Sequence, residues 1–438
     1  MRQWMVAAKK ADFYALAEKF HVDPVVARII RNREVIGEKN IRIYLGGNLS
    51  DLSDPHQMKD MDRLVEILAQ KIRKQVHIRI IGDYDVDGVT SSHLFLTALR
   101  RVGAKVDVVI PHRIQDGYGL SLHLLQQAKE DGVDTILTCD NGIAAIDEIA
   151  WAKAQKMTVL VTDHHAVPFE EHEGRRTEKK SLADAVVNPH QQDCGYPYKE
   201  LCGAGVAWNV IRVLYENYDM DKREAEDLLD FVAMATVCDV MSLTGENRIL
   251  VKEGLKRIRH TKNIGLQALM QACNVQPENI SAYHFGYVLG PCVNATGRLD
   301  TARHALRLFE TGQETEAEEI ARDLVDLNQE RKELTLQGVE MAKKLCEEGG
   351  YENDPVLVLF LPDVHESIAG LIAGRIREMY NRPVFVLTRG EEGVKGSGRS
   401  TENYSMYENM CGCAELFTKF GGHPMAAGLS LPEENVEK

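Results

Sequence analysis

The sequence predicts an α/β protein of two lobes, in which a parallel-sheet lobe is joined by a long helix to a smaller α/β lobe, with a cleft between them. From residue 77 onward, short runs of β-branched residues alternate with amphipathic helical segments, which is typical of βαβ units and a parallel sheet. A charge-rich stretch without proline follows, and a second α/β pattern begins after it. The length of 438 residues is also too great for one hydrophobic core.

The elements are expected in the following order. Residues 1–70 contain no strand-like run, so we expect a helical segment packed on the first lobe. The first lobe, residues 71–300, contains the strand runs HIRIIG, VDVVI, DTILTC, MTVLVT and DAVV. Residues 301–349 are expected to form one or two linking helices, although a solvated surface helix explains the pattern equally well. The second lobe, residues 350–438, begins with the strand VLVLFL, the helix SIAGLIAGRIREMY and the strand PVFVLT.

Composition excludes several classes of protein. Hydrophobic residues make up 44% and charged residues 27% of the chain, as in ordinary soluble proteins. No apolar run approaches the roughly 20 residues that span a bilayer, and the N-terminal stretch is unlike a signal peptide, so we expect a cytoplasmic protein without a membrane partner. The 9 cysteines lack the paired spacing of a disulfide scaffold or a zinc ribbon. The net charge of −14 counts against nucleic acid as a partner, unless carboxylates are gathered around bound cations.

Acidic residues and histidines follow three of the predicted strands. Because the carboxyl ends of parallel strands meet at one edge of a sheet, we expect these side chains to converge. Each acid alone is explained well as a turn residue or a helix N-cap. Together, however, so many carboxylates would repel one another, raise their pKa values and destabilise the fold unless a cation lay between them. The residues concerned are Asp83, Asp85, Asp87, Asp140, Asp163, His164 and His165, with Asp239 near the end of a later apolar segment.

The types of ligand indicate which metal is expected. Carboxylate oxygens with one or two imidazoles suit Mn²⁺ or Mg²⁺, and the imidazole nitrogen favours Mn²⁺, whereas zinc more often takes thiolates or several histidines. The number of ligands exceeds what one ion needs. We therefore predict two divalent cations, about 3.5–4 Å apart as in other two-metal sites.

The ordered motifs DYDVDG, CDNG, VTDHH, VNPHQ and ATVCDVMSL resemble the successive motifs of the DHH phosphoesterase superfamily. LGPCVNATGRLDTA and GGHPMAAGLS resemble more specifically its exonucleases that act on single-stranded DNA, and the likeness extends from about Arg79 to Leu431. The resemblance implies that the metal ligands are Asp83, Asp85, Asp87, Asp140, His164 and Asp239. It also implies a catalytic set of His165, Asp140 and His164, with His165 near the scissile phosphate and Asp163 orienting a neighbouring imidazole.

The second lobe resembles the DHHA1 domain that accompanies this catalytic domain. Its glycine-rich motifs GSGRS and FGGHPMAAG suggest that backbone amides approach an anion. By analogy with the exonucleases, the ligands of nucleic acid and of its 5′-terminal phosphate are Arg113, Arg298, Ser397, Arg399, Gly421, Gly422 and His423, each of which is otherwise explained as an ordinary turn residue. The C-terminal OB-fold that is usual in these exonucleases is expected to be absent.

The resemblance implies two-metal hydrolysis of single-stranded DNA from the 5′ end, with release of 5′-mononucleotides, in DNA repair and recombination. A monomer is expected, with a helicase and a single-strand-binding protein as further partners. Two alternatives stay open. One is a phosphodiesterase of the same superfamily that acts on short RNA or cyclic dinucleotides, and the other is a strand-binding module that does not cut.

Overall fold

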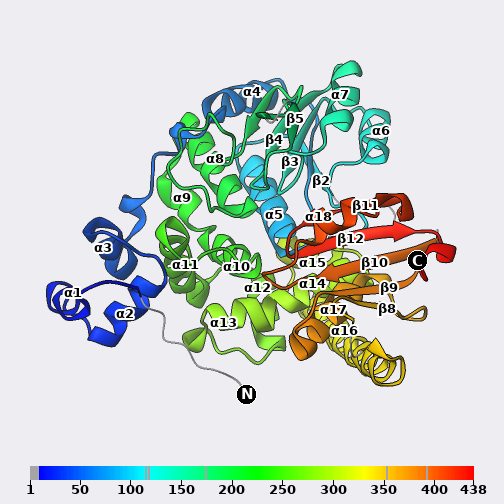
Figure 1. Cartoon of the computed structure of the whole chain (residues 1–438). Coiled ribbons are helices and arrows are strands. Elements are labelled where there is room, and N and C mark those ends of the chain that lie inside the picture. Colours follow the sequence, from blue (N-terminus) through cyan, green and yellow to red (C-terminus); the bar gives the residue numbers. More distant parts are fainter. Residues whose placement is uncertain (1–8, 114–115, 117–118, 173–174, 352–353, 391–392) are drawn as a thin grey trace. The chain divides into compact units, whose positions relative to one another are not determined.

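The computed structural model describes residues 9–113, 116, 119–172, 175–351, 354–390 and 393–438 (Figure 1). The chain divides into two compact units, Met1–Leu324 and Val325–Lys438. In the described ranges, no helix combines the length and the apolar character that crossing a bilayer requires.

The first unit begins with helices, as the sequence predicts. Asp12 and Asp23 cap the first two helices by accepting hydrogen bonds from backbone amides of the first turn. Ile30, Ile41 and Tyr44 form a small separate core with their neighbours. The helices are α1 (Phe13–Phe20), α2 (Pro24–Asn32), α3 (Glu38–Gly46) and α4 (Met61–Arg73).

A parallel sheet of five strands forms the centre of this unit. Its order is β2-β1-β3-β4-β7, and every neighbouring pair is parallel. The strands are β1 (Ile78–Ile81), β2 (Val106–Val109), β3 (Thr135–Cys139), β4 (Thr158–Thr162) and β7 (Ala185–Val187). The five predicted strand runs are therefore confirmed. Because β1, β3 and β4 are adjacent, the residues that come directly after them emerge side by side.

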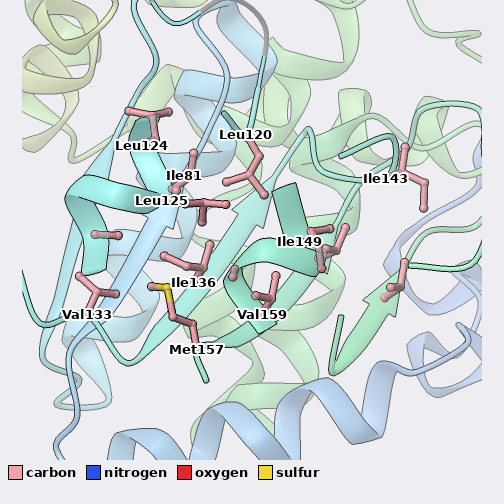
Figure 2. Close-up of a cluster of buried hydrophobic side chains, with 14 residues drawn as sticks. Ile81, Leu120, Leu124, Leu125, Val133, Ile136, Ile143, Ile149, Met157 and Val159 are labelled. Carbon is pink, nitrogen blue, oxygen red and sulfur yellow. The ribbon is translucent and has the colours of Figure 1, made fainter. Parts of the chain in front are cut away.

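Alternate residues of the strands face opposite sides of the sheet. On one side, Ile81, Ile136 and Val159 pack with α6 (Leu122–Glu130) and α7 (Ile146–Ala154) in the cluster that Figure 2 shows. On the other side, α5 (Val86–Arg101) and α8 (Gly203–Asn217) contact the strands and each other. Both of these helices are buried along most of their length, so they hold the edge of the sheet rigidly.

A block of helices completes the unit beyond β7. It comprises α9 (Lys222–Glu226), α10 (Leu229–Cys238), α11 (Gly245–Arg257), α12 (Ile264–Ala272), α13 (Ala282–His284), a π-helical turn (Phe285–Leu289), α14 (Gly290–Leu299) and α15 (Arg303–Glu310). Neither this block nor the antiparallel pair of β5 (Phe169–His172) and β6 (Arg175–Glu178) is predicted from the sequence. The α10 helix is apolar on almost every side, so it lacks the periodic pattern by which a surface helix is predicted.

The stretch 301–349, expected to form one or two helices, forms two: the short α15 (Arg303–Glu310) and the long α16 (Glu314–Glu348). The second unit then has the predicted strand–helix–strand start, with β8 (Leu357–Phe360), α17 (Glu366–Tyr380) and β9 (Val384–Gly390). It continues with β10 (Gly393–Arg399), α18 (Met406–Cys411), β11 (Lys419–His423) and β12 (Ala426–Leu431). The sheet order is β11-β12-β10-β9-β8, with β8 parallel to β9 and the other pairs antiparallel.

Candidate metal centre

The turn between β1 and α5 holds three carboxylates in five residues. Asp83 leaves the strand and is almost completely buried. Asp85 is the N-cap of α5, where its Oδ1 accepts a hydrogen bond from Gly88 N at 3.0 Å. Asp87 lies in the first turn of the same helix. All three aspartates therefore lie in the strand end, the N-cap or the first turn of the helix, where acids are common. Their positions also bring them to the carboxyl edge of the sheet.

Two backbone amides hold the Asp87 carboxylate. Gly203 N donates to Oδ2 at 2.6 Å and Ala204 N donates to Oδ1 at 2.8 Å, both from the first turn of α8. The unsatisfied amides of a helix N-terminus favour negative charge, and this pair of hydrogen bonds orients the Asp87 carboxylate. Gly203 and Ala204 are not predicted from the sequence, because only the fold brings these residues, which are distant from Asp87 in the chain, beside it.

Asp140 follows β3 in a left-handed conformation, with φ 62°. Asp tolerates this region better than most residues, and the turn aims its buried side chain across the strand ends. Asn141 stabilises the same turn, because its Nδ2 donates to Ile81 O at 3.0 Å and to Cys139 O at 2.9 Å. The ends of β1 and β3 are thereby tied together.

His164 follows β4 and faces three of these carboxylates. Its Nε2 lies 3.1 Å from Asp140 Oδ1, 3.6 Å from Asp239 Oδ2 and 3.7 Å from Asp87 Oδ2. Asp239 reaches this point as the C-cap of α10. One imidazole nitrogen thus lies among acids from three different elements.

Burial and mutual repulsion raise the pKa values of the clustered acids. The pKa of Asp83 lies well above its usual range because of burial and then the charge of Asp85. Burial and the charge of Asp87 raise the pKa of Asp85 and, strongly, that of Asp140. The same causes raise the pKa of Asp239 to about 8. Without a neutralising cation, these groups cannot all be charged at neutral pH.

The donor set fits hard divalent cations. Three groups of ligand atoms each lie within 4.8 Å of one another: Asp83, Asp85 and Asp140; Asp87, His164 and Asp239; and Asp140, His164 and His165. The groups share Asp140 and His164, so the donors surround more than one point. Among the residues that the structure describes, no hydrogen-bond donor reaches the buried Oδ1 of Asp83, which is consistent with a ligand atom that needs a cation. All six sequence-predicted metal ligands therefore converge in one place.

The second histidine of the doublet has different partners. His165 Nδ1 lies 2.8 Å from Asp163 Oδ1. Burial alone would lower the pKa of His165, but the hydrogen bond and the charge of Asp163 raise it to about 9. His165 is therefore a cation at neutral pH, and its side chain is about half exposed. Asn188, in the VNPHQ motif directly after β7, contacts the doublet because its Nδ2 donates to His165 O at 2.9 Å.

Two of the predicted phosphate ligands lie near this edge, around Tyr84. The Arg113 guanidinium lies 4.8 Å from the centre of the Tyr84 ring. Arg298 belongs to the last turn of α14, and its charge also acts on the Tyr84 hydroxyl, whose pKa burial raises to about 12. Both arginines are thus beside the residue that separates Asp83 from Asp85.

The remaining predicted phosphate ligands lie on the sheet of the second unit. Ser397 and Gly421 are both paired with Gly428 of the strand between them, and Arg399 and His423 are both paired with Ala426. Residues directly opposite each other point to the same face of a sheet, so Arg399 and His423 share one face. Gly422 adjoins this row on β11, the edge strand.

The expectation that the amides of GSGRS approach an anion is wrong. β10 is an inner strand that pairs with β9 on one side and β12 on the other, so its amides belong to the sheet. The glycines are needed for packing instead: a Cβ at Gly396 would lie 2.5 Å from Leu387 Cδ2, and one at Gly398 would lie 2.4 Å from Met406 Sδ. Gly421 is different, because it lies on the edge strand with open space around it.

This fold and this acidic, histidine-containing sheet edge define a class of phosphoesterases. Residues 77–236 match the family described as DHH family, N-terminal domain, and residues 353–438 match the DHHA1 domain.

Relatives narrow the class further. The chain is 36% identical over 430 residues to the single-stranded-DNA-specific exonuclease RecJ of Haemophilus influenzae, covering 94% of this chain and 72% of that protein. It is 34% identical to the RecJ of Bacillus subtilis, covering 96% of this chain and 52% of the relative. A crystal structure of RecJ from Thermus thermophilus in complex with Mn²⁺ superimposes with a TM-score of 0.80 at 29% identity, over 97% of this chain and 60% of that one. A second structure, of exonuclease RecJ bound to manganese, gives a TM-score of 0.74 at 32% identity over 87% of this chain and 92% of that one. The chain belongs to the RecJ family.

Proposed function

We propose that this protein hydrolyses phosphodiester bonds in single-stranded DNA with two divalent cations, Mn²⁺ or Mg²⁺, proceeding 5′ to 3′ and releasing 5′-mononucleotides. The observation that supports this most directly is the convergence of five carboxylates and an imidazole at one sheet edge. The names of the relatives support the choice of substrate. Manganese bound to RecJ in two solved structures supports the choice of metal.

In this proposal Asp83, Asp85, Asp87, Asp140, His164 and Asp239 hold the cations. When bound, such cations supply Lewis-acid activation of water and neutralise charge that develops at phosphorus. The residues around them do the rest. The two α8 amides orient the Asp87 carboxylate, and Asp163 keeps His165 protonated. The His165 imidazolium donates to an oxygen of the scissile phosphate and stabilises its negative charge in the transition state.

The polarity of the reaction is assigned to the phosphate ligands. The proposed ligands of nucleic acid and its 5′-phosphate are Arg113 and Arg298 of the first unit and Ser397, Arg399 and His423 of the second, with Gly421 and Gly422 allowing close approach. Arginine suits this role because its planar guanidinium donates two hydrogen bonds to one phosphate. A strand held by its 5′ end presents the same linkage to the metals after each cleavage.

We further propose the domain boundaries that the sequence predicts: a helical segment 1–70, a DHH domain 71–300, a linker 301–349 and a DHHA1 domain 350–438. The protein is proposed to act in the cytoplasm as a monomer in DNA repair and recombination, with a helicase and a single-strand-binding protein as partners.

A cleavage assay with end-labelled substrates tests the proposal. In Mn²⁺, a 5′-phosphorylated single strand should be shortened from its 5′ end into mononucleotides, while the same strand in a blunt duplex, a cyclic dinucleotide, a short RNA and pyrophosphate should be poor substrates. Preference for the cyclic dinucleotide or the RNA would assign a different phosphodiesterase activity. An uncut single strand that still binds in Mn²⁺ would indicate a binding module.

A further inference from the structure

The helical segment Ala282–Leu299, which comprises α13, the π-helical turn and α14, runs along the metal centre. Near its start, the Sγ of Cys238 donates to Phe285 O at 3.3 Å, and Cys238 directly precedes the metal ligand Asp239. Further along, Asn294 Oδ1 accepts a hydrogen bond at 3.1 Å from Val86 N, which lies between Asp85 and Asp87. The segment therefore contacts both the α10 side and the α5 side of the centre.

Two tyrosines on this segment form a stacked pair that faces solvent. The rings of Tyr283 and Tyr287 have centroids 5.2 Å apart and planes inclined by 24°. The residues are 62% and 73% exposed. Phe285 and Leu289, between and after them, are fully buried and supply the apolar contacts of the segment. The tyrosine side chains are therefore not part of the core and are accessible to a ligand.

The spacing along the segment relates this pair to the rest of the site. Tyr283 lies in α13 and Tyr287 in the π-helical turn, whereas Asn294, seven residues after Tyr287, lies in α14 and Arg298 in the last turn of α14. Seven residues of helix rise by about 10 Å, which matches roughly three stacked nucleotides at about 3.4 Å each. Arg298, the proposed 5′-phosphate ligand, lies at the opposite end, so the tyrosines lie toward the 3′ part of a bound strand.

We propose that Tyr283 and Tyr287 are a base-stacking platform for unpaired nucleotides on the 3′ side of the scissile bond. This inference deepens the proposed function and rests on it for the direction of the strand. Aromatic rings bind single strands by stacking against bases of any sequence. In a duplex, each base face is already stacked and its edge is paired, so the platform favours single strands without reading sequence.

Variants of the two tyrosines test the platform. Tyr283→Ala and Tyr287→Ala should each weaken binding of a single strand of about 12 nucleotides by about 10-fold, seen as a rise in Kd by fluorescence anisotropy and in KM for cleavage. Tyr287→Trp should restore binding because it keeps a stacking surface. Tyr14→Ala is the matched control, since Tyr14 is 79% exposed but belongs to α1. An abasic site placed about three nucleotides beyond the scissile bond should abolish the difference between wild type and the alanine variants.

Three results would overturn the platform. One is an unchanged Kd in both alanine variants, and another is a loss of cleavage on a dinucleotide, which is too short to reach the tyrosines, as large as the loss on the long strand. The third is weaker binding by the alanine variants than by wild type even when the strand carries the abasic site. Binding is measured separately from cleavage, so failure of the proposed function gives a different result. A wild-type protein that cuts no strand, yet binds one through the tyrosines, would refute the nuclease and leave the platform intact.

Discussion

The Nδ1 of His165 lies 2.8 Å from Oδ1 of Asp163, and the same carboxylate oxygen accepts hydrogen bonds from the backbone amides of both His164 and His165. The other oxygen of Asp163 accepts from Ile143 N at 2.9 Å. The contacts of this buried acid thus orient the histidine doublet, and these hydrogen bonds keep the pKa of Asp163 below its usual value although burial opposes them.

Asp163→Asn is therefore expected to lower turnover by about 10- to 100-fold, because an amide neither stabilises the His165 imidazolium nor fixes its ring. The increase in the thermal midpoint on addition of Mn²⁺ should remain, since Asp163 is not a proposed ligand. Calorimetry and cleavage rates measure the two effects. Loss of the Mn²⁺-dependent shift would show that Asp163 ligates the metal itself.

Asp140→Asn should separate folding from metal binding. Asparagine accepts the left-handed backbone at this position and removes a carboxylate that its neighbours repel, so the metal-free variant should be at least as stable as wild type. Mn²⁺ at about 100 times its Kd stabilises a protein by about 2.7 kcal/mol, and the variant should lose most of this stabilisation together with turnover. Thermal unfolding with and without Mn²⁺ measures both. A variant that keeps wild-type cleavage would refute the assigned centre.

Gly203→Ala should damage the centre without removing any ligand. A Cβ at Gly203 would lie 2.7 Å from Cβ and Oδ1 of Asp140, so the carboxylate must move. At Gly205, two residues further along α8, the nearest atoms are those of Leu201 at 3.4 Å, an ordinary contact. We expect Gly203→Ala to raise the Mn²⁺ concentration needed for half-maximal activity by about 10-fold or more. Gly205→Ala is the control, and equal effects of the two variants would mean a general disturbance of α8.

Two buried groups that are not among the proposed metal ligands should affect stability in opposite ways as the pH falls. Burial among Phe231 and Phe309 lowers the pKa of His93 to about 3. Between the unfolded value of about 6.5 and this folded value, only the unfolded chain is protonated at this residue, so acidification decreases stability. Burial raises the pKa of Asp230 to about 6. At this residue the folded chain binds a proton at a higher pH than the unfolded chain does. The contribution of Asp230 to stability therefore increases on acidification from about pH 6 to about pH 4.

The free energy of unfolding of His93→Gln should therefore fall less steeply than that of wild type between about pH 6.5 and about pH 4, and that of Asp230→Asn should fall more steeply. Each group changes the slope by at most about 1.4 kcal/mol per pH unit. Urea unfolding across this range measures the slopes. Parallel curves for the three proteins would contradict both assignments.

Much of the centre could be predicted because it depends on local patterns. A short apolar run that ends in an acid predicts a strand with a polar end, and strands in a parallel sheet end at one edge. On this reasoning the sequence alone predicts that Asp83, Asp140 and His164 meet, and the fold confirms that β1, β3 and β4 are neighbours. The position of Asp239 does not follow from the sequence in this way, because an apolar helix has no polar face that indicates where its end lies.

The sequence by itself determined the strands, their polar ends and the kind of cation that such ends can bind, because the periodicity of a strand and the donor atoms of a side chain are local properties. Only the tertiary structure decided that the amides of α8 hold Asp87, that α10 delivers Asp239 and that Tyr283 and Tyr287 stack on each other. The first two of these relationships join residues that are far apart in the chain. Packing of apolar helix faces decides which of them meet, and many sequences can satisfy the same packing.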